Sequence, residues 1–248
     1  MSGYDRIGRT YARTRRPDPR IARQIAEALG DARSVVNVGA GTGGYEPRDR
    51  DVVAIEPSSV MLRQRPLDAA PAVQGAAEDI PFADGAFDAA LAVLTMHHWS
   101  DWRAGVDEMR RVARRRIVML TFDPGYISRY WLVRDYLPEI AVGDEKRFPP
   151  VAVVAEALGG ARATPVPIAA DCTDGFLCGA WMRPLSYLDE TVRANISSFA
   201  LLDPATLVAA LARLEQDVAD GTWAERNADL IARDEADFGY RLLVAELA

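Results

Sequence analysis

The sequence is poor in several residue types that carry chemistry. Among its 248 residues there are only two cysteines, two histidines and one lysine. The cysteines, Cys172 and Cys178, are too few for a disulfide framework, and no group of cysteines and histidines has zinc-site spacing, so we expect reduced thiols and no metal. No apolar run is long enough to span a bilayer, which predicts a protein without a membrane partner. The first 20 residues are polar and arginine-rich, unlike a signal peptide, which favours a cytoplasmic protein.

The charge balance narrows the class of partner. The formal net charge is −7, whereas nucleic-acid-binding proteins usually present a basic face, so we expect no nucleic-acid partner. Lys146 is the only lysine beside many arginines, a bias typical of a GC-rich bacterial genome. The hydrophobic content of 49% is ordinary for a globular protein, and the length suffices for one α/β domain with an appended lobe.

The stretch that organises the chain is an apolar run followed at once by glycines, VVNVGAGTGGYE at residues 35–46. The β-branched run predicts a buried parallel strand, and the glycines allow a tight turn and a close approach to a ligand. Gly39, Gly41 and Gly44 fit the dinucleotide-binding pattern G-x-G-x-x-G. Gly39, Gly41 and Gly43 fit an alternative loop, G-x-G-x-G, so the glycines alone leave the ligand open.

A second strand is predicted at residues 51–56, and it ends in the acidic residue Glu56. A carboxylate at this strand end can accept hydrogen bonds from both hydroxyls of a ribose. The glycine loop and Glu56 together therefore indicate a ligand that contains a nucleoside.

The remainder of the first half alternates strands with helices. Asp18 and Pro19 predict the start of a helix, and Gly30 predicts its end. The other expected elements are a short helix after Ser58, a helix after Ser100, and strands at 72–77, 87–96 and 116–123. This alternation predicts a parallel sheet with helices on both faces. Only a very short helix fits between Tyr45 and Asp51, unlike a usual dinucleotide-binding unit.

The alternation stops after residue 123. The expected elements there are helices at 127–137 and 150–158, a strand at 161–170, a mainly helical region at 174–232 and a last strand at 238–247. No flexible linker separates the two halves, so we predict a single domain. In it, residues 1–123 form a ligand-binding core with an N-terminal lid helix, and residues 124–248 supply a substrate-side helical insertion and the closing strands.

Four segments together resemble the small-molecule branch of the S-adenosylmethionine (SAM)-dependent methyltransferases with a Rossmann-like fold, of the methyltransferase type 11 kind. They are Asn37-x-Gly39-x-Gly41-x-Gly43, Ala54-Ile55-Glu56-Pro57-Ser58-x-x-Met61, Ala77-Glu78-Asp79-Ile80-Pro81-Phe82, and Phe87-Asp88-Ala89-Ala90 leading to His97-His98-Trp99. The resemblance covers residues 1–123. It implies a seven-stranded, mostly parallel sheet, a helical lid inserted after the fifth strand, and a last strand antiparallel to its neighbours.

The resemblance also implies SAM as cofactor, S-adenosylhomocysteine (SAH) as product, and a set of binding residues. The glycine loop would lie under the amino-acid and ribose parts of SAM, and Glu56 would bind the ribose hydroxyls. Met61 would pack on the adenine, and Asp79 would accept a hydrogen bond from its amine. The expected cofactor residues are Tyr11, Asn37, Gly39, Ala40, Gly41, Gly43, Glu56, Pro57, Met61, Glu78, Asp79 and Ile80. In this set Asn37 stands where the family usually has an acid.

The candidate catalytic residues are the only two histidines, His97 and His98, at the carboxyl end of a central strand. Either could remove a proton from the methyl acceptor near neutral pH, and either could instead be structural. Residues 95–99 lack the Asn/Asp-Pro-Pro-aromatic pattern used to methylate nucleic-acid bases, which points to a small-molecule acceptor. The aromatic residues expected to contact it are Tyr4, which with Tyr11 resembles an aromatic lid, and Tyr130, Trp131 and Trp181.

The favoured function is a SAM-dependent methyltransferase that acts by in-line displacement, without a metal, on oxygen or nitrogen, less often carbon, of a metabolite. We expect a monomer or a homodimer. Two alternatives stay open. The first is a non-catalytic SAM-fold binding or accessory protein, indicated by Asn37 and the shortened helix. The second is an NAD-dependent oxidoreductase, indicated by Gly39-x-Gly41-x-x-Gly44.

Overall fold

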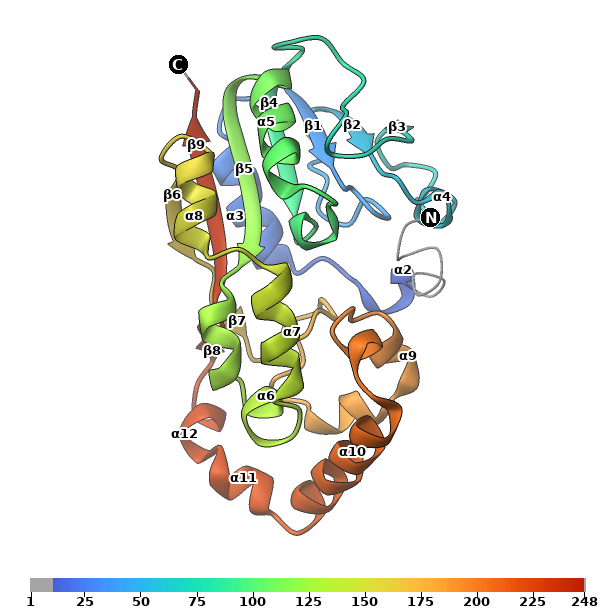
Figure 1. The fold of residues 1–248 in the computed structure, drawn as a ribbon, viewed down its shortest axis with the longest axis vertical. Coiled ribbons are helices and arrows are strands. Elements are labelled where there is room, and N and C mark those ends of the chain that lie inside the picture. The colour runs from blue at the N-terminus through green and yellow to red at the C-terminus, as the bar shows by residue number, and fades with distance from the viewer. Residues whose placement is uncertain (1–10, 248) are drawn as a thin grey trace.

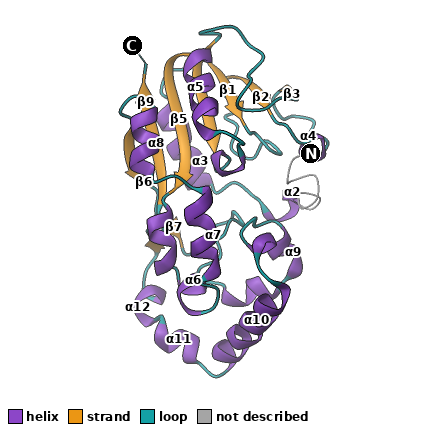
Figure 2. Ribbon diagram, viewed as in Figure 1, coloured by secondary structure: helices purple, strands orange, loops and turns teal. Residues whose placement is uncertain are grey.

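Seven strands form the central sheet of this computed structural model, which describes residues 11–247. Their spatial order is β3-β2-β1-β4-β5-β9-β6 (Figure 1 and Figure 2). The bounds are β1 Ser34–Val38, β2 Asp51–Ile55, β3 Ala72–Val73, β4 Phe87–Val93, β5 Ala113–Phe122, β6 Arg162–Pro165 and β9 Tyr240–Glu246. The paired strands among β1–β5 are parallel, whereas β9 runs antiparallel to both β5 and β6. The predicted seven-stranded, mostly parallel sheet with an antiparallel last strand is confirmed.

Helices cover both faces of the sheet because neighbouring strand residues are buried on opposite sides. The covering helices are α3 (Pro19–Leu29), α5 (Trp102–Val112) and α8 (Val151–Ala157). Val35 and Leu91 share one buried cluster with the apolar side of α3. Val36 and Ile117 belong to a second cluster, which contains the apolar sides of α5 and α8. The layers therefore follow from the strand alternation and the helical periodicity that the sequence shows.

Two segments differ from the sequence-based expectation. No helix forms in residues 39–50, where we expected a very short one, and turns and bends connect β1 to β2 instead. The strand expected at 161–170 is divided between β6 and β7 (Ile168–Ala169), and β7 pairs with β8 (Glu235–Ala236) in a separate two-stranded sheet. Pro167, which lies between β6 and β7, explains this division, because proline has no N–H with which to continue a strand ladder.

The segment after β5 forms a mainly helical lobe, as expected. Its elements are η3 Pro124–Arg129, α6 Trp131–Asp135, α7 Glu139–Arg147, η4 Pro184–Leu188, α9 Glu190–Ala194, η5 Phe199–Leu201, α10 Pro204–Ala219, α11 Thr222–Arg226 and α12 Ala228–Ile231. Figure 1 shows the lobe beyond the carboxyl ends of the parallel strands. Three short helices complete the described chain: α2 Tyr11–Thr14, α4 Ser59–Leu62 and η2 Met96–His98.

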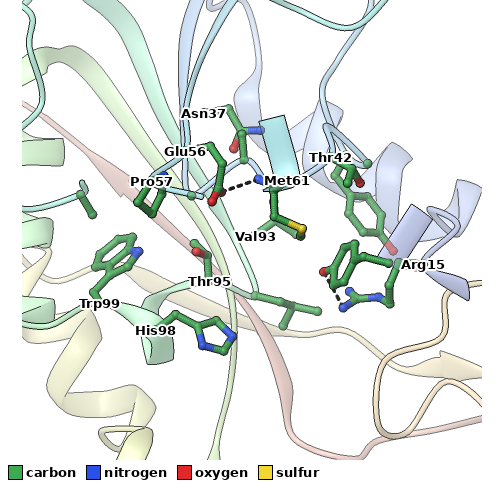
Figure 3. A pocket seen from close by; sticks show the side chains of 18 of the residues that line it. Arg15, Asn37, Thr42, Glu56, Pro57, Met61, Val93, Thr95, His98 and Trp99 are labelled. Carbon is green, nitrogen blue, oxygen red and sulfur yellow. Dashed lines mark hydrogen bonds between the residues drawn. The ribbon is translucent and has the colours of Figure 1, made fainter. Parts of the chain in front are cut away.

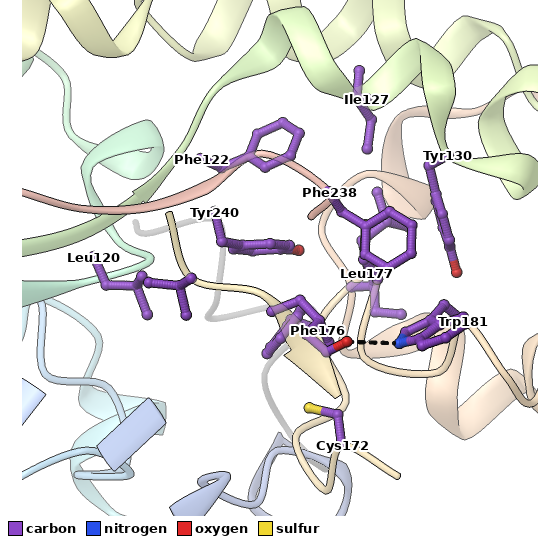
Figure 4. Close-up of a cluster of buried hydrophobic side chains, with 14 of the residues drawn as sticks. Leu120, Phe122, Ile127, Tyr130, Cys172, Phe176, Leu177, Trp181, Phe238 and Tyr240 are labelled. Carbon is purple, nitrogen blue, oxygen red and sulfur yellow. Dashed lines mark hydrogen bonds between the residues drawn. The ribbon is translucent and has the colours of Figure 1, made fainter. Parts of the chain in front are cut away.

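One buried apolar cluster joins the lobe to the sheet. Leu120 and Phe122 at the end of β5 belong to the same cluster as Tyr130, Trp181 and Phe238 of the lobe (Figure 4). The lobe and the sheet thus share one core, while the single domain and its division at residue 124 stay predictions. Among the helices described, none has the length and apolar character needed to cross a membrane.

Candidate active site

A cavity of about 370 Å³, called the large cavity below, lies at the carboxyl ends of β1, β2 and β4 (Figure 3). Open α/β sheets bind ligands at this edge, and the volume lies within the range of roughly 300–1,000 Å³ that is usual for small-molecule sites. Residues that follow each of the three strands line the cavity, together with Arg15 from the N-terminal segment and Asp174 from the lobe. The fold therefore brings both halves of the chain to one site.

The glycine loop after β1 has a backbone shape that other residues do not readily adopt. Gly39 and Gly41 have φ values of +69° and +55°. A Cβ atom on Gly39 would lie 2.0 Å from Oγ1 of Thr95, so this glycine also makes room for the Thr95 side chain. Gly43 has a positive φ as well, but it does not line the large cavity, unlike Gly39, Ala40 and Gly41.

Glu56 joins the end of β2 to the glycine loop. Its side chain is buried, and its Oε2 accepts a hydrogen bond of 2.8 Å from the backbone N–H of Gly41 (Figure 3). Its Oε1 accepts a second bond of 2.8 Å from the N–H of Ser58. A carboxylate offers about four lone-pair sites, so this geometry is compatible with bonds from ligand hydroxyls as well. Glu56 faces the large cavity, where the ribose was expected.

Asn37 lies next to the loop in β1 and is buried. Its Nδ2 donates to Oε1 of Glu46 at 3.3 Å, while its Oδ1 is a buried atom without a hydrogen-bond partner in the described protein. Buried polar atoms without partners are rare in native structures. An unmatched acceptor on the wall of the large cavity fits a ligand that brings a hydrogen-bond donor, such as the ammonium group of SAM.

The remaining expected cofactor residues divide into two groups. Tyr11, Pro57, Met61 and Glu78 line the large cavity, whereas Asp79 and Ile80 do not. Ile80 instead belongs to the core cluster that contains the apolar side of α5, and its backbone N–H donates to Glu108, so its expected place beside the adenine stays a prediction that the cavity lining does not support. From the segment that contains Asp79, the residues that line the large cavity are Ala76, Ala77 and Glu78. Tyr4 lies outside the described residues.

Sequence reasoning missed an ion pair at the mouth of the large cavity. Nε of Arg15 lies 2.6 Å from Oδ1 of Asp174, and Nη1 of Arg15 donates to the hydroxyl of Tyr11 at 2.7 Å. The hydroxyl of Tyr45 donates to the same carboxylate at 2.9 Å. Arg15 and Asp174 are 159 residues apart, and neither belongs to a recognisable motif, so no sequence signal links them.

The two histidines face different spaces. His98 lines the large cavity, and His97 lines a smaller one of about 60 Å³, called the small cavity, while their rings lie 3.8 Å apart. His97 also stacks on Phe148, with 4.3 Å between the ring centroids. Burial lowers the pKa of His97 well below its ordinary value, helped by His98, Arg147 and Arg15. The side chain of His98 is exposed where it faces the large cavity, yet desolvation by the surrounding protein and the same two arginines lower its pKa to about 4. Both imidazoles are therefore neutral at pH 7.

The other aromatic candidates are core residues. Tyr130, Trp131 and Trp181 are at most 1% exposed and line neither cavity. Their polar atoms bond within the protein: the hydroxyls of Tyr130 and Tyr187 lie 2.6 Å apart, and Nε1 of Trp131 donates to the carbonyl of Trp181 at 3.0 Å. All three belong to the core that the lobe and the sheet share, and their contact with the acceptor stays a prediction that neither cavity supports.

The cysteines are free thiols, and the described residues contain no cluster of metal-binding side chains. Cys172 and Cys178 are both free and buried, and burial raises the pKa of the Cys172 thiol to about 12, which keeps it protonated. Within residues 11–247, no group of three or more histidine, cysteine, aspartate and glutamate side chains could hold a metal ion.

Comparison with known proteins identifies the family. A family model described as a methyltransferase domain matches residues 36–119. A crystal structure of a proposed methyltransferase from an antibiotic biosynthesis pathway of Anabaena variabilis ATCC 29413 shares 34% sequence identity and a TM-score of 0.87. The alignment covers 94% of this chain and 99% of that one. The [4+2]-cyclase SpnF, at 18% identity and a TM-score of 0.55, covers 92% of this chain and 80% of its own length, and it shares the fold alone.

Curated relatives match over shorter stretches. The uncharacterized methyltransferase YcgJ of Bacillus subtilis is 28% identical over 45% of this chain and 44% of its own length. An uncharacterized methyltransferase of Mycobacterium tuberculosis is 39% identical over 42% of each chain. This chain thus spans less than half the length of these two relatives. Since about a third of its residues are identical to the Anabaena protein along nearly the whole of both chains, the protein belongs to the family of class I SAM-dependent methyltransferases.

Proposed function

We propose that the protein transfers the methyl group of SAM to an oxygen or nitrogen atom of a small-molecule metabolite that enters the small cavity. The observation that carries this proposal is the adjacency of two cavities, with His98 on the wall of one and His97 on the wall of the other. SAM supplies a methyl group on a good leaving group. The protein then has mainly to align the acceptor with that methyl.

Leu94 marks the boundary between the two spaces. It lines both cavities, and it is the only non-glycine residue in the described part of the chain with a positive φ, +49°. A left-handed backbone costs a leucine about 1–2 kcal/mol, and such strain persists where the surroundings enforce it, often at functional sites. Its N–H donates to the carbonyl of Leu120 in β5 at 2.8 Å, which fixes this turn. The turn supports a transfer point at the end of β4.

The small cavity has walls that suit a compact acceptor with an apolar body. Phe122, Phe148, Phe176 and Tyr240 contribute aromatic rings, and the buried carboxylate of Asp144 contributes a polar group. The space of about 60 Å³ is far below the usual range of roughly 300–1,000 Å³, so it takes the reacting end of the acceptor rather than a whole drug-sized molecule. The assignment of the Anabaena relative to an antibiotic biosynthesis pathway supports a metabolite as acceptor.

His97 is the proposed base. A neutral imidazole can accept the proton of a hydroxyl or of an ammonium group as the methyl is transferred, and its stacking on Phe148 fixes the ring on the cavity wall. Because its pKa is lowered, the base is already deprotonated at pH 7. An oxygen or nitrogen acceptor of the proposed kind would give its proton to this imidazole as the methyl arrives, which leaves a neutral product and an imidazolium.

The test is SAH formation from SAM in the presence of fractionated bacterial metabolite extracts, followed by variants with the acceptor so found. His97→Gln should lower turnover by about 10²–10⁴-fold, the usual contribution of a general base, with SAM affinity nearly unchanged. His98→Gln is the matched control and should have a smaller effect. Wild-type turnover in both variants would refute the base. SAM binding without turnover in any extract would favour the non-catalytic alternative.

A further inference from the structure

A buried ion pair stands behind the glycine loop, in the region where the usual crossover helix is missing. Nη2 of Arg65 lies 2.8 Å from both carboxylate oxygens of Glu46, and each side chain is only 6% exposed. Arg65 also donates to the carbonyls of Ala70 at 2.8 Å and Gly41 at 3.4 Å. A buried pair is tolerated only when further hydrogen bonds satisfy its atoms, and here they link residues 46 and 65 to the loop.

This pair determines which way the amide of Asn37 faces. A carboxylate held by an arginine only accepts hydrogen bonds, so the NH₂ group of Asn37 must be the atom that approaches Glu46, at 3.3 Å. The oxygen of the same amide is then turned away from Glu46. That oxygen is buried, has no partner in the described protein, and belongs to a residue that lines the large cavity.

We propose that Glu46, held by Arg65, positions Asn37 so that its side-chain oxygen accepts a hydrogen bond from the α-ammonium group of SAM. The inference rests on the proposed SAM site. An ammonium group has three donors and no acceptor, so it matches an orphaned carbonyl oxygen. Glu46 and Arg65 are positioning residues, because Asn37 alone would touch the cofactor.

The same arrangement explains Gly43, which the glycine pattern had assigned to the cofactor. A Cβ atom on Gly43 would lie 2.9 Å from Oε2 of Glu46 and 3.2 Å from Nη1 of Arg65. The glycine therefore makes room for the ion pair. In this chain the third glycine of the G-x-G-x-G loop serves the residues that orient Asn37.

The experiment compares two ligands by calorimetric titration: SAH, and 5′-methylthioadenosine, which keeps the adenine and ribose but lacks the amino-acid arm. Asn37→Leu removes the acceptor and leaves the Glu46–Arg65 pair intact. It should weaken SAH binding about 10- to 100-fold, the range for a hydrogen bond to a charged group, with 5′-methylthioadenosine binding unchanged. The double variant Glu46→Leu/Arg65→Met leaves no unpaired buried charge and should show the same selective loss.

A second ion pair provides the control. Asp237 and Arg241, 2.7 Å apart, line neither cavity, so Asp237→Leu/Arg241→Met should bind both ligands as the wild type does. Equal losses for the two ligands in the Glu46/Arg65 variant would mean that the pair only supports the loop, which overturns the inference. Unchanged SAH binding in Asn37→Leu would overturn it too. A wild-type protein that binds neither ligand would instead refute the SAM site itself.

Discussion

Replacing Glu56 by glutamine tests the cofactor site at the point where sequence and structure agree best. Both carboxylate oxygens accept backbone N–H groups at 2.8 Å, one from Gly41 and one from Ser58. Glutamine has one oxygen and one NH₂ group, so one of these N–H groups must face another donor. A buried donor without a partner costs about 1–3 kcal/mol, which should appear as a lower melting temperature.

The same substitution should weaken SAH binding. A hydrogen bond to a charged group contributes roughly 1.5–3 kcal/mol, and each 1.4 kcal/mol is tenfold in affinity, so we expect about a 10- to 100-fold loss for the ribose contact. Calorimetric titration with SAH measures it. Asp88→Asn is the control, because Asp88 lines neither cavity and its two bonds from backbone N–H groups, those of Arg33 and Ser34, reach one oxygen, which asparagine retains. If Glu56→Gln lowers the melting temperature but binds SAH with wild-type affinity, Glu56 only stabilises the glycine loop, and our assignment of Glu56 to the ribose is wrong.

Two further predictions concern stability. Gly39→Ala should lower the urea midpoint of unfolding more than Gly160→Ala does. Both glycines have a positive φ, but only a Cβ on Gly39 would meet the Thr95 side chain. Equal midpoints would show that Thr95 moves aside at no cost in stability. The lowered pKa of His98, about 4 against 6.5, means that the unfolded chain binds more protons between these values. The contribution of His98 to stability is therefore complete above pH 6.5 and is lost as pH falls toward 4. The melting temperature of His98→Gln should fall less between pH 7 and pH 5 than that of the wild type, and parallel curves would contradict the assignment.

The helices and strands predicted best are those whose capping residues and apolar pattern lie within the element itself. The helix at Pro19–Leu29 was expected from Asp18 and the apolar stripe, and the Asp18 side chain does accept the N–H of Arg20 at its start. The strands β1, β2, β4 and β5 follow from short apolar runs at regular spacing. The strand at 161–170 was misjudged because pairing with β9 or β8 depends on partners more than 60 residues away, which periodicity does not report.

The residues of the candidate site could be predicted where one short motif lines the large cavity. They could not be predicted where segments distant in the sequence meet there. Gly39, Gly41 and Glu56 were found from one stretch, and membership of the methyltransferase family decides for G-x-G-x-G over the dinucleotide pattern. Arg15 and Asp174 were missed because no motif contains them.

By itself, the sequence determined the strand–glycine–strand unit, the acid after β2 and hence a ligand that contains a nucleoside, because these depend on backbone shape and residue type within about 20 positions. It also determined the layers of the fold through hydrophobic periodicity. Only the tertiary structure decided which aromatic residues are core, which histidine faces which cavity, and which way the Asn37 amide is turned. Burial, pKa and amide orientation are set by neighbours that the chain brings together only when it folds.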